Sequence, residues 1–119
     1  MGKELLGRVQ QKSLRNGLRL YEMAKFRLIS TGQFKKDLKL AKKRGLSLDD
    51  LFAITDLLEG GMPIPEKNRN HQLHGQYEGC WECHINPDWL LIYIKDTEIR
   101  IISLQRTGTH SDLFGKNRK

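Results

Sequence analysis

The chain has 119 residues, of which 38% are hydrophobic and 29% charged, and its formal net charge is +7. These values fit one soluble globular domain and exclude a disordered or fibrous chain. With no apolar stretch long enough for a membrane span or a secretory leader, and too few cysteines for a disulfide framework, we expect a cytoplasmic protein. The positive excess favours a polyanionic partner, although charge alone is equally compatible with a basic protein that binds no nucleic acid.

Residues 1–22 form a basic segment with a loose helical leucine pattern that Gly7 and Gly17 interrupt. The pattern that begins at Met23 is complete without them. We therefore expect an accessory N-terminal extension over residues 1–22 and a domain over residues 23–119, with a functional basic arm as the alternative for the extension.

The N-terminal part of the domain predicts one strand and two helices. Apolar and basic residues alternate between residues 24 and 30, which favours a strand. Thr31 can cap a first helix and Ser47 a second, each with its own apolar stripe, and Gly60 and Gly61 end the second helix. The two stripes consist of Phe34, Leu38 and Ala41, and of Leu48, Leu51, Phe52, Thr55 and Leu58.

The polar face of the first helix is rich in lysine. Such a face is usually only solvated, and the alternative is a face that contacts phosphate groups. We take Lys35, Lys36 and Lys39 as candidate substrate-binding residues.

The C-terminal half predicts a polar loop over residues 68–79 and then three strands, over residues 81–85, 89–94 and 99–105. Their short connections favour an antiparallel meander. With the two helices packed on one face, the expected fold class is an α+β sandwich built on a small antiparallel sheet.

All four histidines lie between residues 71 and 110, in the same half as Glu82, Asp88 and Arg106. Imidazoles exchange protons near neutral pH, and a guanidinium binds phosphate through paired hydrogen bonds. Metal-independent RNA cleavage needs this set: a base for the 2′-OH, an acid for the leaving 5′-oxygen and a cation for the phosphorane. Taken alone, however, such histidines are more often surface or structural residues.

Three ordered sequence blocks resemble a known family. They are residues 70–75 (NHQLHG), residues 82–93 (ECHINPDWLLIY) and residues 106–114 (RTGTHSDLF). From Met23 onward the chain resembles the RelE/YafQ toxins of bacterial type II toxin–antitoxin systems. The resemblance implies the RelE-like sheet with two helices, and a ribosome-dependent endoribonuclease that cleaves mRNA by 2′-OH attack, inhibits translation and uses neither a metal nor a cofactor.

The resemblance also implies site residues. It implies His110 as general acid and Arg106 as phosphate ligand, while His84 with Asp88, and also His71, are candidates for the base or for a residue that orients it. Trp89 and Phe114 are candidates to stack on nucleobases, and a buried core position is an equal alternative for Trp89. His74 has no counterpart in the family.

Two positions depart from the family pattern. Trp81 stands where the family often has an arginine, and Asn70 and Gln72 replace the acid and the proline of a D-H-P-L block. If the family arginine holds phosphate, its loss predicts weaker activity or a different codon preference, with no effect on the fold. The partners implied are an acidic cognate antitoxin, the ribosome with its mRNA, and operator DNA only for the toxin–antitoxin complex, with no membrane.

Three other interpretations compete with the toxin. Residues 80–84 match the C-x-x-C-H pattern of haem attachment, and His71, His74, Cys80 and Cys83 have spacing usable for zinc. Both require Cys80 and Cys83 on one side, whereas strand positions three apart face opposite sides. The third is a non-catalytic basic RNA- or DNA-binding module or an inactive toxin-like regulator, and the coincidence of His84, Asp88, Arg106 and His110 disfavours it.

Overall fold

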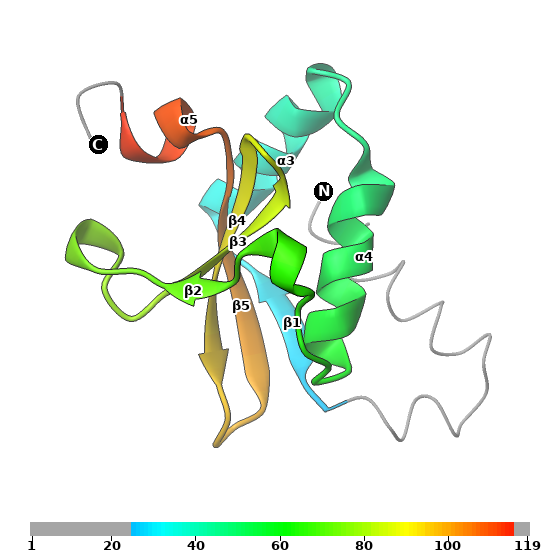
Figure 1. Ribbon diagram of the computed structural model, residues 1–119, viewed down its shortest axis with the longest axis vertical. Coiled ribbons are helices and arrows are strands. Elements are labelled where there is room, and N and C mark those ends of the chain that lie inside the picture. The colour runs from blue at the N-terminus through cyan, green and yellow to red at the C-terminus, as the bar shows by residue number, and fades with distance from the viewer. Residues whose placement is uncertain (1–24, 116–119) are drawn as a thin grey trace.

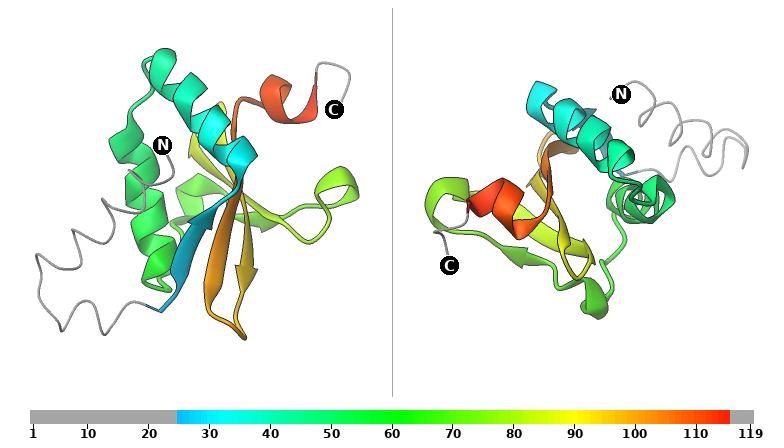
Figure 2. Two further views of the ribbon diagram at one scale, coloured as in Figure 1. Left: turned by 180° about the vertical axis from the view of Figure 1, so that it is seen from behind. Right: turned by 90° about the horizontal axis from the view of Figure 1, so that it is seen from above.

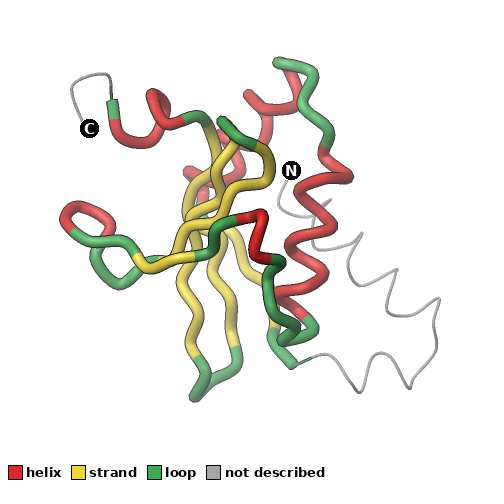
Figure 3. Tube along the Cα trace, in the orientation of Figure 1, coloured by secondary structure: helices red, strands yellow, loops and turns green. Residues whose placement is uncertain are grey.

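A computed structural model describes residues 25–115, which form a five-stranded sheet with two long helices on one face (Figures 1 and 2). The expected extension over residues 1–22 lies outside the described residues. The elements in chain order are β1 (Arg27–Ser30), α3 (Gly32–Lys43), α4 (Leu48–Glu59), β2 (His71–Gln72), β3 (Trp81–Asn86), β4 (Trp89–Asp96), β5 (Ile101–Gly108) and α5 (His110–Phe114). Figure 3 shows how loops and two short 3₁₀ turns, Glu66–Asn68 and Gly75–Tyr77, connect the central elements.

Both long helices begin where their caps predict. The Thr31 hydroxyl accepts a hydrogen bond from the backbone N–H of Phe34 at 3.0 Å, and the Ser47 hydroxyl accepts one from Asp50 at 3.4 Å. These contacts satisfy amide donors that have no partner within the first helical turn. The predicted apolar stripes are buried on both helices, with Leu48 only partly covered.

The strand order is β1-β5-β4-β3-β2, and the predicted antiparallel meander of β3, β4 and β5 is confirmed. The α+β class with two helices on one face is confirmed as well. One edge of the sheet differs from a purely antiparallel arrangement, because β1 pairs in parallel with β5, Arg27 lying opposite Ile101. This pairing joins segments more than 70 residues apart, and no local pattern in the sequence specifies it.

Two apolar clusters lie on opposite faces of the sheet. The larger cluster fills the space between the sheet and α3 and α4, and it includes Trp89, which is 1% exposed. The smaller cluster, of Cys80, Leu90, Ile92 and Leu113, lies on the other face, beneath α5. The view from above in Figure 2 shows α5 separated from α3 and α4 by the sheet. None of the helices formed by residues 25–115 is long and apolar enough to cross a membrane.

Short elements occupy the segment expected as a polar loop. β2 pairs with β3 and adds a fifth strand, with His71 opposite Glu82. After β5 the chain forms α5, whose capping box joins Thr109 and Asp112. The Thr-x-x-Asp spacing indicates such a start, but a helix of five residues gives too little apolar periodicity to be detected.

Candidate active site

A cleft of about 500 Å³ lies on the face of the sheet that α3 and α4 leave uncovered. Three histidines line it, His71 from β2, His84 from β3 and His110 from the start of α5. The ring centroid of His84 lies 6.4 Å from that of His71 and 5.8 Å from that of His110. The structure thus brings together the three histidines that the sequence nominated. His74 is not part of the row: its side chain is 82% exposed.

Glu82 lies between two of these histidines and was given no role in the sequence analysis. Its Oε1 is 3.3 Å from His71 Nε2 and 3.8 Å from His84 Nε2, and the residue is only 3% exposed. Oε2 is also buried and has no hydrogen-bond partner among residues 25–115. A buried carboxylate without a full set of donors is costly unless cations or substrate groups approach it. The spacing in the sequence could have identified Glu82, because it lies two positions before His84 and alternate residues of a strand share one face.

His71 is fixed from both ring nitrogens. Nδ1 lies 2.7 Å from the carbonyl oxygen of Arg69, and a carbonyl can only accept, so Nδ1 carries a proton. Arg69 itself has a φ of 50°, a left-handed conformation that is uncommon for a residue with a side chain. The neighbouring Asn70, which replaces the family acid, accepts a hydrogen bond from the Tyr93 hydroxyl at 2.6 Å. Although Asn70 replaces the family acid, its hydrogen bond with Tyr93 still anchors the start of β2.

Asp88 contacts His110 and not His84, which corrects the expected pairing of His84 with Asp88. Its Oδ1 accepts from the backbone N–H of His110 at 3.3 Å and lies 3.1 Å from His110 Nδ1. The side-chain hydrogen bond from His110 is the main reason that the pKa of Asp88 is lowered from its ordinary value. Asp88 therefore orients the histidine that we expect to be the acid, and Glu82 is the carboxylate beside His84.

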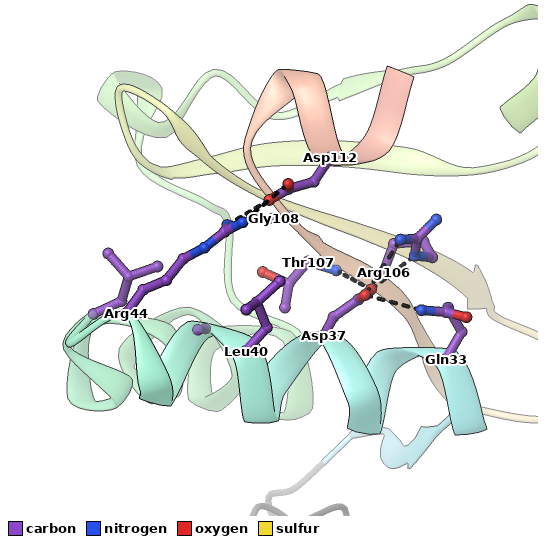
Figure 4. A pocket seen from close by; sticks show the side chains of 10 residues that line it. Gln33, Asp37, Leu40, Arg44, Arg106, Thr107, Gly108 and Asp112 are labelled. Atoms are coloured by element: carbon purple, nitrogen blue, oxygen red, sulfur yellow. Dashed lines mark hydrogen bonds and ion pairs between the residues drawn. The ribbon is translucent and has the colours of Figure 1, made fainter. Parts of the chain in front are cut away.

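Arg106 lies on β5, outside the set of residues that line the histidine cleft, and is held by a buried carboxylate from α3 (Figure 4). Arg106 Nε donates to Asp37 Oδ2 at 2.7 Å and Nη2 donates to Oδ1 at 3.2 Å. On the other side of the guanidinium, Nη1 approaches the Tyr77 hydroxyl at 3.4 Å. The rings of Tyr77 and Phe114 meet edge to face, with their centroids 5.3 Å apart. The centroid of the Phe114 ring lies 6.2 Å from that of His110. Sequence reasoning missed both Asp37 and Tyr77.

The other substrate-binding candidates separate into two groups. Phe114 is partly exposed next to His110 and remains a candidate for stacking, whereas Trp89 is buried in the main core, so we withdraw it as a stacking residue. Lys35, Lys36 and Lys39 are exposed on α3, and none of them lines the histidine cleft.

Trp81 packs against the main core on the face opposite Glu82 and His84. A side chain at position 81 of β3 therefore points away from the cleft, because neighbouring strand residues face opposite sides. The missing family arginine consequently removes no cation from the cleft of this chain.

Cys80 and Cys83 are free and belong to different clusters on opposite faces of the sheet. Neither the haem nor the zinc arrangement can therefore use both thiols. Burial raises the pKa of the Cys83 thiol to about 12. In the described part of the chain, no group of three or more His, Cys, Asp or Glu side chains is arranged to hold a metal ion.

Comparison with known proteins shows which family the chain is similar to. Residues 26–115 match the family model described as "Bacterial toxin of type II toxin-antitoxin system, YafQ". The mRNA interferase toxin YafQ of Escherichia coli K12 is 41% identical over 86 residues, which cover 71% of this chain and 91% of that protein.

Two solved structures are similar over most of the fold. One is the E. coli DinJ–YafQ toxin–antitoxin complex, with a TM-score of 0.70 and 36% identity, covering 76% of this chain and 99% of the matched one. The other is a metal-bound toxin from Helicobacter pylori, with a TM-score of 0.69 and 34% identity, covering 73% and 97%.

Proposed function

Because this chain belongs to the YafQ family of type II toxin–antitoxin toxins, which includes mRNA interferases, we propose that it is an endoribonuclease that cleaves mRNA on the ribosome. The observation that carries the chemistry is the row of histidines in one cleft. His84 lies 5.8 Å from His110, centroid to centroid, and each has a carboxylate neighbour, Glu82 or Asp88. The attacking 2′-oxygen and the leaving 5′-oxygen lie on opposite sides of the phosphorus, so a base and an acid that act on them must also be several ångströms apart.

The reaction proposed is transesterification within the RNA strand. A base removes the proton of the 2′-OH, the 2′-oxygen bonds to the adjacent phosphorus, and the bond from phosphorus to the 5′-oxygen breaks. An acid protonates that departing oxygen. The products are a 2′,3′-cyclic phosphate and a 5′-hydroxyl, and no oxidant or second substrate is needed.

We assign the acid to His110. Asp88 accepts from His110 Nδ1, so Nε2 is the nitrogen left to donate a proton to the leaving oxygen. The contact with Asp88 also fixes the orientation of the imidazole ring. This arrangement follows the logic of a carboxylate that orients a catalytic histidine.

We assign the base to His84. Both ring nitrogens of His71 are already engaged, one by the Arg69 carbonyl and one by Glu82. His84 lies in the middle of the row, and its longer 3.8 Å distance to Glu82 leaves it freer to accept a proton. His71 then serves to hold Glu82 in place, and Arg106 stabilises the charge on the phosphorane.

The proposed partners follow from charge and family. We propose an acidic, partly disordered antitoxin that folds on binding, by analogy with the DinJ–YafQ complex of E. coli. Lys35, Lys36 and Lys39 present positive charge on α3 to ribosomal RNA, and operator DNA is bound only by the toxin–antitoxin complex. Translating ribosomes place this activity in the cytoplasm.

The deciding experiment measures cleavage of a defined mRNA, free and on programmed ribosomes, and the chemistry of the new ends. We expect cleavage only on the ribosome, with cyclic phosphate ends, and none when the 2′-oxygen at the cut site is methylated. His110→Ala should slow cleavage by roughly 10² to 10⁴-fold. His74→Ala, at an exposed histidine outside the cleft, is the matched control and should cleave normally.

Three results would overturn parts of this proposal. Cleavage of the methylated message, or 3′-hydroxyl ends, would exclude attack by the 2′-oxygen. Equal cleavage of free mRNA would remove the ribosome from the proposal. Tight RNA binding without any cleavage would favour the alternative of a non-catalytic binding module or an inactive toxin-like regulator.

A further inference from the structure

Asp37 is a buried acidic residue on α3, outside the histidine cleft and absent from the three family-like blocks. It is 8% exposed, and its two carboxylate oxygens receive four hydrogen bonds. The donors are Arg106 Nε and Nη2, the backbone N–H of Thr107 at 3.1 Å, and Gln33 Nε2 at 3.1 Å. A buried carboxylate satisfied in this way is fixed in one position and fixes its partners in turn.

We propose that Asp37 is a positioning residue that sets the orientation of Arg106 toward the RNA phosphate. This inference rests on the proposed function, because it assigns Asp37 an indirect part in stabilising the phosphorane at that site. Asp37 itself does not touch the substrate.

The geometry of the guanidinium carries the argument. Arginine presents five N–H groups in one plane. Asp37 occupies the side formed by Nε and Nη2, and Tyr77 approaches one N–H of Nη1. By count, these contacts leave one N–H group on each terminal nitrogen for a further acceptor. A phosphate bound through these groups is held in the plane of the guanidinium, which Asp37 determines.

The backbone at this point of β5 depends on the same carboxylate. β1 pairs with β5 only from Ile101 to Leu104, so the strand edge is open at Thr107. The carboxylate of Asp37 fills that gap by accepting from the Thr107 N–H. Figure 4 shows Gln33 and Asp37 on the face of α3 that looks toward the end of β5, with Arg44 at the C-terminal cap of the helix, so one side of this helix supports the segment that carries Arg106.

The test is a double-mutant cycle between Asp37→Asn and Arg106→Ala. Asparagine keeps the shape and one acceptor oxygen for Thr107, but it turns an N–H₂ group toward the guanidinium and removes the charge. Single-turnover cleavage on programmed ribosomes should fall by roughly 100-fold in Asp37→Asn, with little change in the concentration of half-saturation. In the Arg106→Ala background, Asp37→Asn should change the rate by no more than about twofold.

A second measurement needs no activity. The Nε–H signal of Arg106, identified by its loss in Arg106→Lys, is expected to be protected from solvent exchange in the NMR spectrum of the free protein. Asp37→Asn should abolish that protection, while Asp50→Asn, at an exposed carboxylate on α4, should preserve it. Thermal unfolding of each variant shows whether the fold is retained.

The outcomes distinguish a failure of the positioning role of Asp37 from a failure of the proposed endoribonuclease function. Equal rate losses from Asp37→Asn with and without Arg106 would show that Asp37 acts on the fold and not through Arg106. Unchanged protection of Arg106 in Asp37→Asn would also overturn the proposal. If the wild-type protein cleaves no message although Arg106 is protected by Asp37, the proposed function fails and Asp37 loses its catalytic part, leaving only a structural contact.

Discussion

The carboxylate of Asp88 contacts His110 twice, once at the backbone N–H and once at ring Nδ1, with distances of 3.3 and 3.1 Å. Asp88 lies just before β4, and His110 begins α5, so two segments that are 22 residues apart meet here. The double contact fixes the ring and the first residue of the helix together. His110 therefore projects into the cleft from a defined backbone position.

Replacing Asp88 by Asn should impair the acid without unfolding the protein. The amide can still accept from Nδ1–H, but a neutral acceptor binds more weakly than a carboxylate and therefore orients the ring less firmly. We expect single-turnover cleavage to fall by roughly 10 to 100-fold, with little change in thermal stability, since the pair is largely exposed. Asp50→Asn is the control. A variant as active as the wild type would show that Asp88 does not assist His110.

A second prediction concerns acid stability and Asp112. Its carboxylate accepts from Arg44 Nη1 at 2.7 Å and from the backbone N–H of Thr109 at 2.8 Å, and so anchors α5 to α3. Chiefly through the side-chain hydrogen bond from Arg44, the pKa of Asp112 is lowered from 3.8 to about 2. The folded state thus holds this carboxylate ionised more strongly than the unfolded chain does.

The resulting stabilisation is complete above the ordinary pKa of the group and is lost as the pH falls from 3.8 toward 2. Because the pair is solvent-exposed, we expect its contribution to the free energy of unfolding to be small. Unfolding in denaturant, followed from pH 7 to pH 2, should show a smaller acid loss in Asp112→Asn than in the wild type. If the free energy of unfolding depended on pH equally in the two proteins, Asp112 would not be the source of this acid loss.

Local signals in the sequence predicted much of this molecule. The caps at Thr31 and Ser47 act within one helical turn, and the alternation around His84 sets its face, so both can be recognised in a single stretch of chain. The site could be predicted from the sequence only in part, because its contacts join residues that are far apart in the chain. The contacts of Asp37 with Arg106 and of Asp88 with His110 join residues 69 and 22 positions apart, and only the folded sheet brings them together.

The cysteines provide a third prediction. The Cys83 side chain is fully buried, and its raised pKa leaves almost no thiolate at neutral pH. Native protein should therefore react with a thiol reagent at Cys83 only after unfolding. Cys83→Ser should lower the free energy of unfolding by about 1–3 kcal/mol, because the hydroxyl enters an apolar site. Cys83→Ala is the matched control without a polar group, and rapid labelling of Cys83 in the folded protein would contradict this account.

The extension over residues 1–22 gives a fourth prediction. The family match covers residues 26–115, and the described fold starts at residue 25. We expect a chain that starts at Met23 to fold, bind the antitoxin and remain toxic in a growth assay. Loss of solubility or of toxicity on truncation would make the extension part of the domain.

The final prediction concerns a groove that continues the histidine cleft. A cavity of about 470 Å³ shares Arg69, His84 and Pro87 with the cleft. Beyond them it is lined by Lys67, by partly buried Ile85 and by other residues of the same two segments. Two cations beside an apolar wall suit a phosphate and the nucleotide attached to it.

We therefore expect Lys67→Gln and Arg69→Gln to weaken binding of the message more than they slow the chemical step. On programmed ribosomes, the half-saturation concentration should rise several-fold, while the maximal single-turnover rate stays within about twofold of the wild type. For binding of a single-stranded RNA, the dependence of log K on log salt should become shallower by about 0.7 for each phosphate that the protein no longer neutralises. Arg27→Gln on β1, at the opposite edge of the sheet from β2, is the matched loss of one positive charge and should change the half-saturation concentration little. Equal effects of all three variants would mean that only net charge matters, and the groove would then have no part in holding the RNA.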